Sequence, residues 1–214
     1  MNKNVLIFCA HSDDQILGPG GTTAKLSAQG YQVTNVIFTN GELSHPWLKR
    51  RITAQVREDE ARSADLVVGG KGVLFLGITE PNFINEAKAQ WVKEKILHIL
   101  QEYKPVKIFL HSGDDPHAGH RAVKDTVLEV YDLHKFNCDV YTFDIWNFFN
   151  LKERGLPRLY VDTSETFGRK IEALKCFKSQ WMTMITLLWS VYARAFLKGI
   201  EFRTKYAERF YKVR

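Results

Sequence analysis

The feature that most limits what this chain can fold into is the recurrence of short apolar runs with helix-period segments between most of them. The runs are rich in β-branched and aromatic residues, and their lengths are those of buried strands. Such alternation predicts an α/β fold built on a parallel sheet. The expected strands are residues 5–9, 32–39, 73–76, 106–110 and 140–145.

The segments between the strands carry helix end signals. Gly30 and Gly69 each follow such a segment, and Pro105 follows another. No internal repeat or low-complexity segment divides the chain. We therefore expect one domain over residues 1–214, a Rossmann-like, mostly parallel sheet with helices on both faces. The expected helices are residues 21–29, 52–68, 85–103 and 120–133.

Composition narrows the class of protein. With 214 residues, 45% of them hydrophobic, the chain can bury one good core. Its three cysteines, Cys9, Cys138 and Cys176, have no CxxC spacing, which is typical of reduced thiols. The apolar run before His11 is too short for a secretory signal. We expect a cytoplasmic protein.

Charge and hydropathy indicate what the chain does not bind. The net charge is +6, but the basic residues after Lys152 are spread singly among apolar ones, as on a solvated face, so no nucleic-acid partner is expected. Residues 181–193 carry no charge but are shorter than the roughly 20 residues of a transmembrane span. Their helical spacing predicts a core or subunit-contact helix, with a membrane-surface helix less favoured, and leaves a homo-oligomer open.

Metal-ligating side chains follow the first expected strand. The sequence there is Ala10-His11-Ser12-Asp13-Asp14, and a glycine-rich stretch, Gly18-Pro19-Gly20-Gly21, comes next. A histidine and a carboxylate three residues apart can both reach one metal ion, while the neighbouring carboxylate stays free to handle a proton. Helix capping is the bland alternative for the two aspartates, but it does not explain His11.

A second cluster, His117-Ala118-Gly119-His120, follows the fourth expected strand. In a doubly wound sheet the first and fourth strands lie side by side where the strand order reverses, and ligands bind at their carboxyl ends. The two clusters should therefore converge, which predicts a mononuclear zinc hydrolase. The other histidines, His45, His98, His111 and His134, are interpreted as ordinary polar residues.

These motifs resemble the LmbE-like, or PIG-L, family of zinc-dependent N-acetylglucosaminyl deacetylases. The strand followed by Ala10-His11-Ser12-Asp13-Asp14-Gln15 and Gly20-Gly21-Thr22 is similar to the opening signature of the family. Similar stretches continue along the chain: Thr39-Asn40-Gly41-Glu42, Arg57-Glu58-Asp59-Glu60-Ala61, Phe75-Leu76-Gly77 and Tyr206-Ala207-Glu208-Arg209-Phe210.

The resemblance implies an enzyme that removes an N-acetyl group from a small amino-sugar substrate. It implies that His11, Asp14 and His120 bind Zn²⁺, that Asp13 is the general base, and that His117 stabilises the oxyanion. Arg57 stands where the family has a substrate-contacting arginine, although a helix-surface pair with Glu60 is an alternative.

The chain also departs from the family pattern. Ser12 and Gln15 replace the usual proline and glutamate, and Ala118-Gly119 replaces the usual Pro-Asp. That aspartate would help to orient His117, so Asp114 or Asp115 would have to take its place.

The loop after the second strand, residues 42–50, is expected to border the site. Trp47 there can stack on a sugar ring, and Lys49, Arg50 and Arg57 would favour an anionic aglycone. Packing of Trp47 into a core or a subunit contact is the alternative. Two other functions compete with the deacetylase: a noncatalytic metal- or sugar-binding protein on the same fold, and a Rossmann-type nucleotide-binding module. The glycine spacing departs from GxGxxG, which disfavours the second.

Overall fold

A computed structural model describes residues 3–45, 47–147, 150, 152–153 and 155–214. Its centre is one seven-stranded sheet with the order β3-β2-β1-β4-β5-β7-β6. Five strands run parallel, and β7 is antiparallel to both of its neighbours. The strands are β1 (Asn4–Cys9), β2 (Gln32–Thr39), β3 (Gly72–Ile78), β4 (Lys107–His111), β5 (Asp139–Phe143), β6 (Arg158–Asp162) and β7 (Ala207–Lys212).

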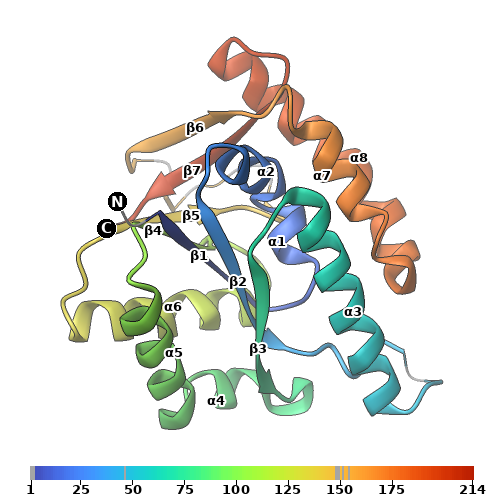
Figure 1. The fold of residues 1–214 in the computed structure, drawn as a ribbon, viewed down its shortest axis with the longest axis vertical. Helices are drawn as coiled ribbons and strands as arrows, with labels where there is room; N and C mark the ends of the chain where they lie inside the picture. The colour runs from blue at the N-terminus through green and yellow to red at the C-terminus, as the bar shows by residue number, and fades with distance from the viewer. Residues whose placement is uncertain (1–2, 46, 148–149, 151, 154) are drawn as a thin grey trace.

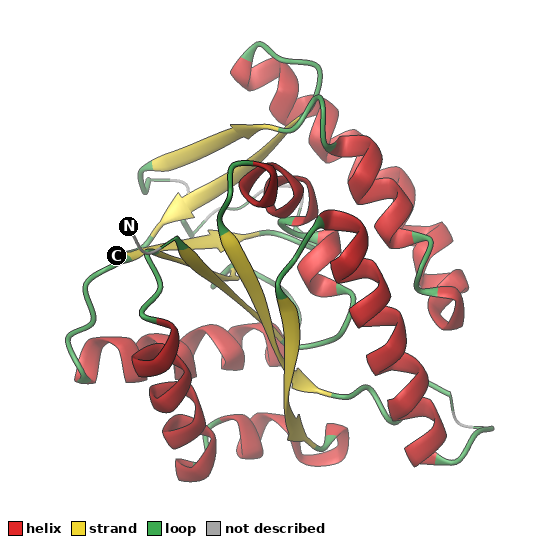
Figure 2. Cartoon of the chain, in the orientation of Figure 1, coloured by secondary structure: helices red, strands yellow, loops and turns green. Residues whose placement is uncertain are grey.

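Helices cover both faces of the sheet (Figures 1 and 2). Strand β1 shows why, because its side chains alternate between two separate apolar clusters: Val5, Ile7 and Cys9 belong to one, and Leu6 and Phe8 to the other. The first cluster packs beneath α1 (Asp14–Leu17), α2 (Gly20–Ala28), α3 (Arg50–Val68), α7 (Phe167–Leu174) and α8 (Trp181–Phe202). The second packs beneath α4 (Phe83–Ala87), α5 (Gln90–Tyr103) and α6 (Ala118–Leu133).

The predicted α/β fold with a mostly parallel sheet is therefore confirmed. So is the placement of the first and fourth strands: β1 pairs in parallel with β4, with Val5 opposite Lys107 and Ile7 opposite Phe109. The carboxyl ends of these strands meet at one edge of the sheet. Among the described residues no helix is long and apolar enough to cross a bilayer.

The single helix expected over residues 85–103 is wrong. Residues 85–103 form two helices, α4 and α5, preceded by a short 3-10 turn at Glu80–Asn82. The break has a local cause, since Ala89 is extended, with φ −65° and ψ 149°, and Glu86 accepts hydrogen bonds from both the backbone and the hydroxyl of Thr79. The side chain of Glu86 thereby ties α4 to the end of β3. The structure also contains α1, β6, α7 and β7, which were not expected from the sequence.

Candidate active site

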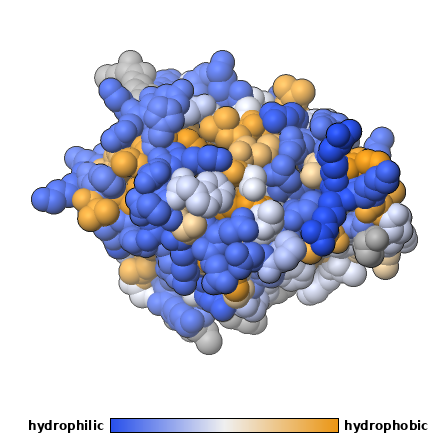
Figure 3. All heavy atoms as spheres, turned by 90° about the horizontal axis from the view of Figure 1, so that it is seen from below, coloured by the Kyte–Doolittle hydropathy of each residue, from blue (hydrophilic) through white to orange (hydrophobic). Residues whose placement is uncertain are grey.

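The two predicted clusters converge at the carboxyl ends of β1 and β4. His11, Asp13 and Asp14 follow β1, and His117 and His120 stand at the start of α6. Figure 3 views the molecule from below Figure 1, the side towards which β2 and β3 run, and shows hydrophobic surface there flanked by hydrophilic side chains.

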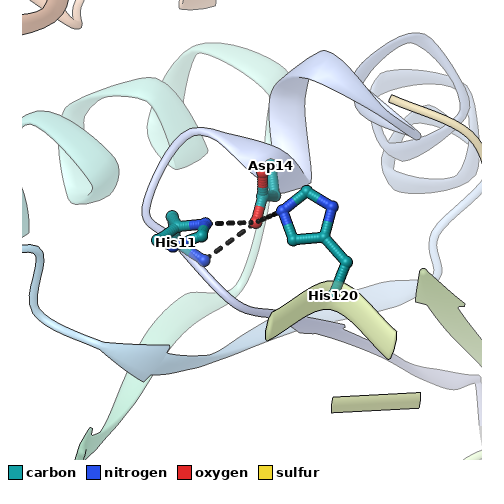
Figure 4. Close-up of side chains that lie close together, drawn as sticks. All are labelled: His11, Asp14 and His120. Atoms are coloured by element: carbon teal, nitrogen blue, oxygen red, sulfur yellow. Dashed lines mark hydrogen bonds and ion pairs between the residues drawn. The ribbon is translucent and has the colours of Figure 1, made fainter. Parts of the chain in front are cut away.

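Three of these side chains point at one another (Figure 4). The Asp14 Oδ2 atom lies 3.4 Å from His11 Nδ1 and 3.5 Å from His120 Nε2. It also accepts a hydrogen bond of 2.8 Å from the His11 backbone N–H, which fixes the turn after β1. Asp14 is only 3% exposed, whereas His11 is partly open to solvent.

This donor set fits a zinc ion. Ligand bonds of about 2.0–2.1 Å in a tetrahedral arrangement place the donor atoms roughly 3.3 Å apart. The two distances to Asp14 Oδ2 are close to that value. Burial alone would raise the pKa of the Asp14 carboxyl, but the neighbouring His120 imidazole and the hydrogen bond from His11 hold it well below its usual range. The carboxyl is therefore ionised, as a ligand must be. Two imidazoles and one carboxylate leave a fourth position free, which is typical of catalytic zinc.

Asp115 supports this set from behind. Its Oδ2 atom lies 3.1 Å from His120 Nδ1, so the carboxylate can orient the imidazole whose other nitrogen faces Asp14. Its Oδ1 atom accepts a hydrogen bond of 2.9 Å from the backbone N–H of His117. Asp115 thus positions both histidines of the second cluster.

His111 belongs to this centre as well, although the sequence analysis set it aside. Its ring stacks on that of His120 with 3.9 Å between centroids, and its Nε2 atom lies 3.3 Å from Asp14 Oδ2. The same Nε2 accepts a hydrogen bond from the backbone N–H of Ala10. Burial and the neighbouring His120 lower the pKa of His111 to about 4, so the ring is neutral. Its position as the last residue of β4, directly beside β1, was the signal in the sequence.

Asp13 does not cap α1, because no hydrogen bond joins its side chain to the helix end. Its Oδ2 atom instead lies 3.6 Å from the Arg57 guanidinium. Arg57 is 3% exposed, and two of its nitrogens, Nε and Nη1, are buried without a hydrogen-bond partner among the described residues. The alternative pairing of Arg57 with Glu60 does not form, since Glu60 accepts hydrogen bonds from the backbone and hydroxyl of Ser179.

His117 is the exposed member of the cluster. Its ring centroid lies 5.1 Å from that of His11 and 4.6 Å from that of His120. Burial of the ring and the neighbouring His120 lower the pKa of His117. Among the described residues no carboxylate is hydrogen-bonded to this ring. A Cβ at Gly119 would lie 3.1 Å from the ring, so the ring can occupy this position because residue 119 has no side chain.

A cavity of about 140 Å³ opens over these groups. Its lining includes His11, Asp13, Asp14, Arg57, His117 and His120. The loop after β2 borders it through Gly41 and Ser44, and Trp47 is not part of the lining. Trp47 is 77% exposed and its ring contacts that of His45. The aromatic side chain in the cavity wall is Trp146.

A groove of about 690 Å³ adjoins the cavity and shares His11, Glu80 and His117 with it. The rest of its described lining is uncharged and consists of Leu43, Pro81, Asn82, Phe83, Ile84, Asn85, Ala118 and Gly119. Glu80 is thus the carboxylate of this lining, and no lysine or arginine of the described chain lines it.

The remaining family-like motifs shape the loops around the site. Glu42 accepts hydrogen bonds from the Glu80 backbone and the Thr39 hydroxyl, so it ties the loop after β2 to the loop after β3. The Asn40 side chain donates a hydrogen bond to Glu58 on α3. These contacts hold both loops beside His11, Asp14 and His120, the candidate metal ligands.

Glu208 on β7 binds the start of α2. Its two carboxylate oxygens accept hydrogen bonds from the backbone N–H groups of Gly21 and Thr22, at the start of α2. One of them also pairs with the buried Lys170 at 2.7 Å. Glu208 therefore fixes α2, the second helix after the turn that carries His11 and Asp14.

The family model and the relatives in sequence are those of deacetylases. The family model of the GlcNAc-PI de-N-acetylases (PIG-L) matches residues 6–131. The diacetylchitobiose deacetylase of Thermococcus kodakarensis is 26% identical, over 90% of this chain and 75% of that protein. A probable N-acetyl-alpha-D-glucosaminyl L-malate deacetylase 2 of Bacillus anthracis is also 26% identical, over 93% and 91%.

Solved structures share the fold. The N,N'-diacetylchitobiose deacetylase of Pyrococcus horikoshii superposes with a TM-score of 0.83 at 21% identity, covering 99% of this chain and 84% of that one. GalB, a 4-carboxy-2-hydroxymuconate hydratase of Pseudomonas putida, superposes with a TM-score of 0.80 at 22% identity, covering 99% and 96%. Because a hydratase has the same fold, the fold alone does not select the reaction.

Proposed function

The chain belongs to the GlcNAc-PI de-N-acetylase (PIG-L) family, and from this premise we propose that it is a zinc-dependent N-deacetylase. It would hydrolyse the acetamide of a small N-acetylglucosamine derivative to acetate and a free amine, with residues 1–214 acting as one domain. The observation that carries the proposal is the convergence of His11, Asp14 and His120 beside the carboxylate of Asp13 in one cavity.

His11, Asp14 and His120 would hold the zinc ion. When bound, zinc supplies a positive charge that lowers the pKa of water and polarises an amide carbonyl. Two further roles fall to the surrounding residues. One group must accept the proton of the attacking water, and another must donate a hydrogen bond to the acetamide oxygen as it becomes negative.

Asp13 is proposed to take the proton from the attacking water and to pass it to the nitrogen of the leaving amine. The Arg57 guanidinium, 3.6 Å away, holds the Asp13 carboxylate in place. Arg57 also lines the cavity, and we propose that it contacts a polar group of the substrate there.

His117 is proposed to stabilise the negative charge that develops on the acetamide oxygen. Its ring lines the cavity and faces those of His11 and His120. Its lowered pKa favours a neutral imidazole at neutral pH, which can donate one hydrogen bond.

The groove beside the cavity is proposed to hold the aglycone. Its lining has one carboxylate, that of Glu80, and among the described residues no cation. An uncharged aglycone such as a second sugar fits this lining better than the anionic one expected from the loop sequence. Trp146 in the cavity wall is better placed than Trp47 to stack on the sugar ring.

An acetate-release assay tests the function. The purified protein is given zinc and two substrates, N,N'-diacetylchitobiose and N-acetylglucosaminyl malate, which differ in the charge of the aglycone. We expect acetate from the neutral substrate, loss of activity with a chelator, and recovery when zinc is restored. A protein that binds zinc but releases no acetate from either substrate would be the noncatalytic alternative.

The aglycone proposal has its own variant. Glu80→Gln keeps an oxygen that accepts the hydrogen bond from the Leu43 backbone but removes the negative charge. We expect kcat/KM to rise several-fold for the malate compound and to stay within about twofold for diacetylchitobiose. Glu94→Gln, on the exposed side of α5, is the matched control. A preference for the malate compound in the wild type, unchanged by Glu80→Gln, would refute the aglycone assignment and leave the deacetylase proposal standing.

A further inference from the structure

Helix α8 exposes an apolar surface that nothing in the described chain covers. Figure 1 shows α8 on the outside of the molecule. Nine large hydrophobic side chains of this helix are between 41% and 66% exposed. They are Trp181, Met182, Ile185, Trp189, Tyr192, Phe196, Leu197, Ile200 and Phe202. The only other exposed residues of α8 are Thr186 and Glu201.

The opposite side of α8 is already in the core. Leu187, Val191 and Ala195 pack in the apolar cluster on this face of the sheet. Gly199 faces the turn after the helix, because a Cβ there would lie 2.7 Å from the backbone oxygens of Thr204 and Lys205. The helix is therefore apolar on both sides, which is typical of a helix buried on both sides.

The exposed residues repeat at helix-pairing intervals. Steps of three and four residues alternate along Met182, Ile185, Trp189, Tyr192 and Phe196. This is the heptad spacing of residues that pack one helix against another. Trp189 is the middle of the five, so an antiparallel partner with the same sequence would place Trp189 opposite Trp189 and Met182 opposite Phe196.

The area is that of a stable subunit contact. Nine large side chains that are each about half exposed offer on the order of 900 Å². The largest apolar patch on a typical monomer is roughly 300–600 Å². A standard protein–protein interface buries about 800 Å² per partner. The α8 surface is therefore larger than an incidental patch and large enough for a dimer.

The charges on α8 indicate whether its apolar face binds a membrane surface or a second copy of the chain. A helix that lies on a membrane carries lysines and arginines along its polar side. On α8 the exposed charge is that of Glu201, which is held by the Tyr160 hydroxyl at 2.6 Å and by Arg209 and Lys198 at 3.1 Å each. Lys198 is mostly buried, and Arg194 donates to the backbone oxygens of Asp144 and Ile145. Within Trp181–Phe202 neither cation is free, and two copies of this helix can meet without repulsion.

We propose that α8 is the contact between two copies of this chain, packed antiparallel about a twofold axis near Trp189. The same patch is used on both subunits, as a twofold contact requires. The contact borders the catalytic cavity, because Thr183 and Leu187 of α8 line that cavity. The proposal does not depend on the reaction that the site performs.

Analytical ultracentrifugation of the full chain tests the contact. At micromolar concentration we expect twice the mass of one chain for the wild type and the mass of one chain for Trp189→Glu. Leu66→Lys on α3 and Leu133→Lys on α6 are matched controls, because these leucines are 75% and 72% exposed outside α8, and both variants should stay dimeric. A monomeric wild type, or an oligomer that Trp189→Glu leaves intact, would overturn the proposal.

Cross-linking supplies a readout that does not depend on a charged substitution. Met182→Cys mixed with Phe196→Cys should give a disulfide-linked dimer under mild oxidation, and Leu133→Cys should not.

Sedimentation with zwitterionic and anionic lipid vesicles tests whether α8 binds a membrane surface instead. Vesicle binding by a monomeric wild type that Trp189→Glu abolishes would assign α8 to a membrane surface and refute the dimer.

Discussion

The replacement Asp65→Asn should change how the stability of this protein depends on pH. Asp65 lies on α3 and is 2% exposed, where its carboxylate accepts a hydrogen bond of 2.7 Å from the Asn35 side chain. Gly70 packs directly against it. Burial raises the pKa of Asp65 from 3.8 to about 6, because the hydrogen bonds and the charge of Arg62 only partly offset the loss of water.

The sign of the effect follows from the raised pKa. The folded protein binds this proton more tightly than the unfolded chain, so the contribution to stability is fully present below pH 3.8 and is lost as the pH rises through about 6. A shift of about two pKa units corresponds to about 3 kcal/mol. Asparagine is never ionised there and keeps an oxygen for Asn35.

Urea unfolding of the wild type and Asp65→Asn at several pH values measures the effect. The free energy of unfolding of the variant minus that of the wild type should rise by about 2–3 kcal/mol between about pH 4 and pH 7.5. Asp59→Asn, at an exposed position of the same helix, is the control and should give a flat difference. If the difference for Asp65→Asn is also flat, its carboxyl is not the buried acid that the structure describes.

Three further changes probe the site and its support. Asp13→Asn should retain zinc but lose about 10²–10⁴-fold in kcat, since the amide cannot accept a proton, and activity within a fewfold of the wild type would exclude Asp13 as the base. Asp115→Asn should weaken zinc binding about 10–100-fold in chelator competition, because His120 loses the carboxylate that orients it, and unchanged affinity would leave Asp115 a purely structural role. Glu208→Ala should lower the free energy of unfolding by about 3–5 kcal/mol, because Lys170 is left buried without its carboxylate and keeps only the hydrogen bond to the Gly18 carbonyl, whereas a loss below about 1 kcal/mol in chemical denaturation would show that water solvates this charge.

The local pattern was sufficient for much of the sheet. Strands β1 to β5 are apolar runs between glycine and proline signals, and the expected ranges agree with them to within a few residues. Strand β6 was missed because its apolar run is only three residues long, between Arg158 and Asp162, and β7 was missed because Glu208 and Arg209 interrupt it. The Glu208 and Arg209 side chains pair with α2 and α8, and such pairing is not visible in local hydropathy.

In the site, too, some features could be predicted from the sequence and others depend on contacts between distant residues. The convergence of His11, Asp14 and His120 was predictable because strand order places the ends of β1 and β4 together. His111 was missed because its neighbours in sequence offer no further ligand, and only its place at the end of β4, next to β1, connects it to the site. There its Nε2 accepts a hydrogen bond from the backbone N–H of Ala10. The loop with Trp47 was expected beside the site from its starting point alone, but which of its side chains turn inward depends on the Glu42 contacts to the loop after β3.

The place of β7 in the sheet bears on how the protein is made on the ribosome. Residues 207–212 are translated after every other described strand, yet they lie between β5 and β6 and supply Glu208 to the start of α2. Until they leave the exit tunnel, β5 has an open edge, β6 has no neighbour, and α2 lacks the carboxylate that holds its first turn. The proposed metal site is therefore expected to mature only after translation of this strand, and nascent chains that stall before it would expose an aggregation-prone edge.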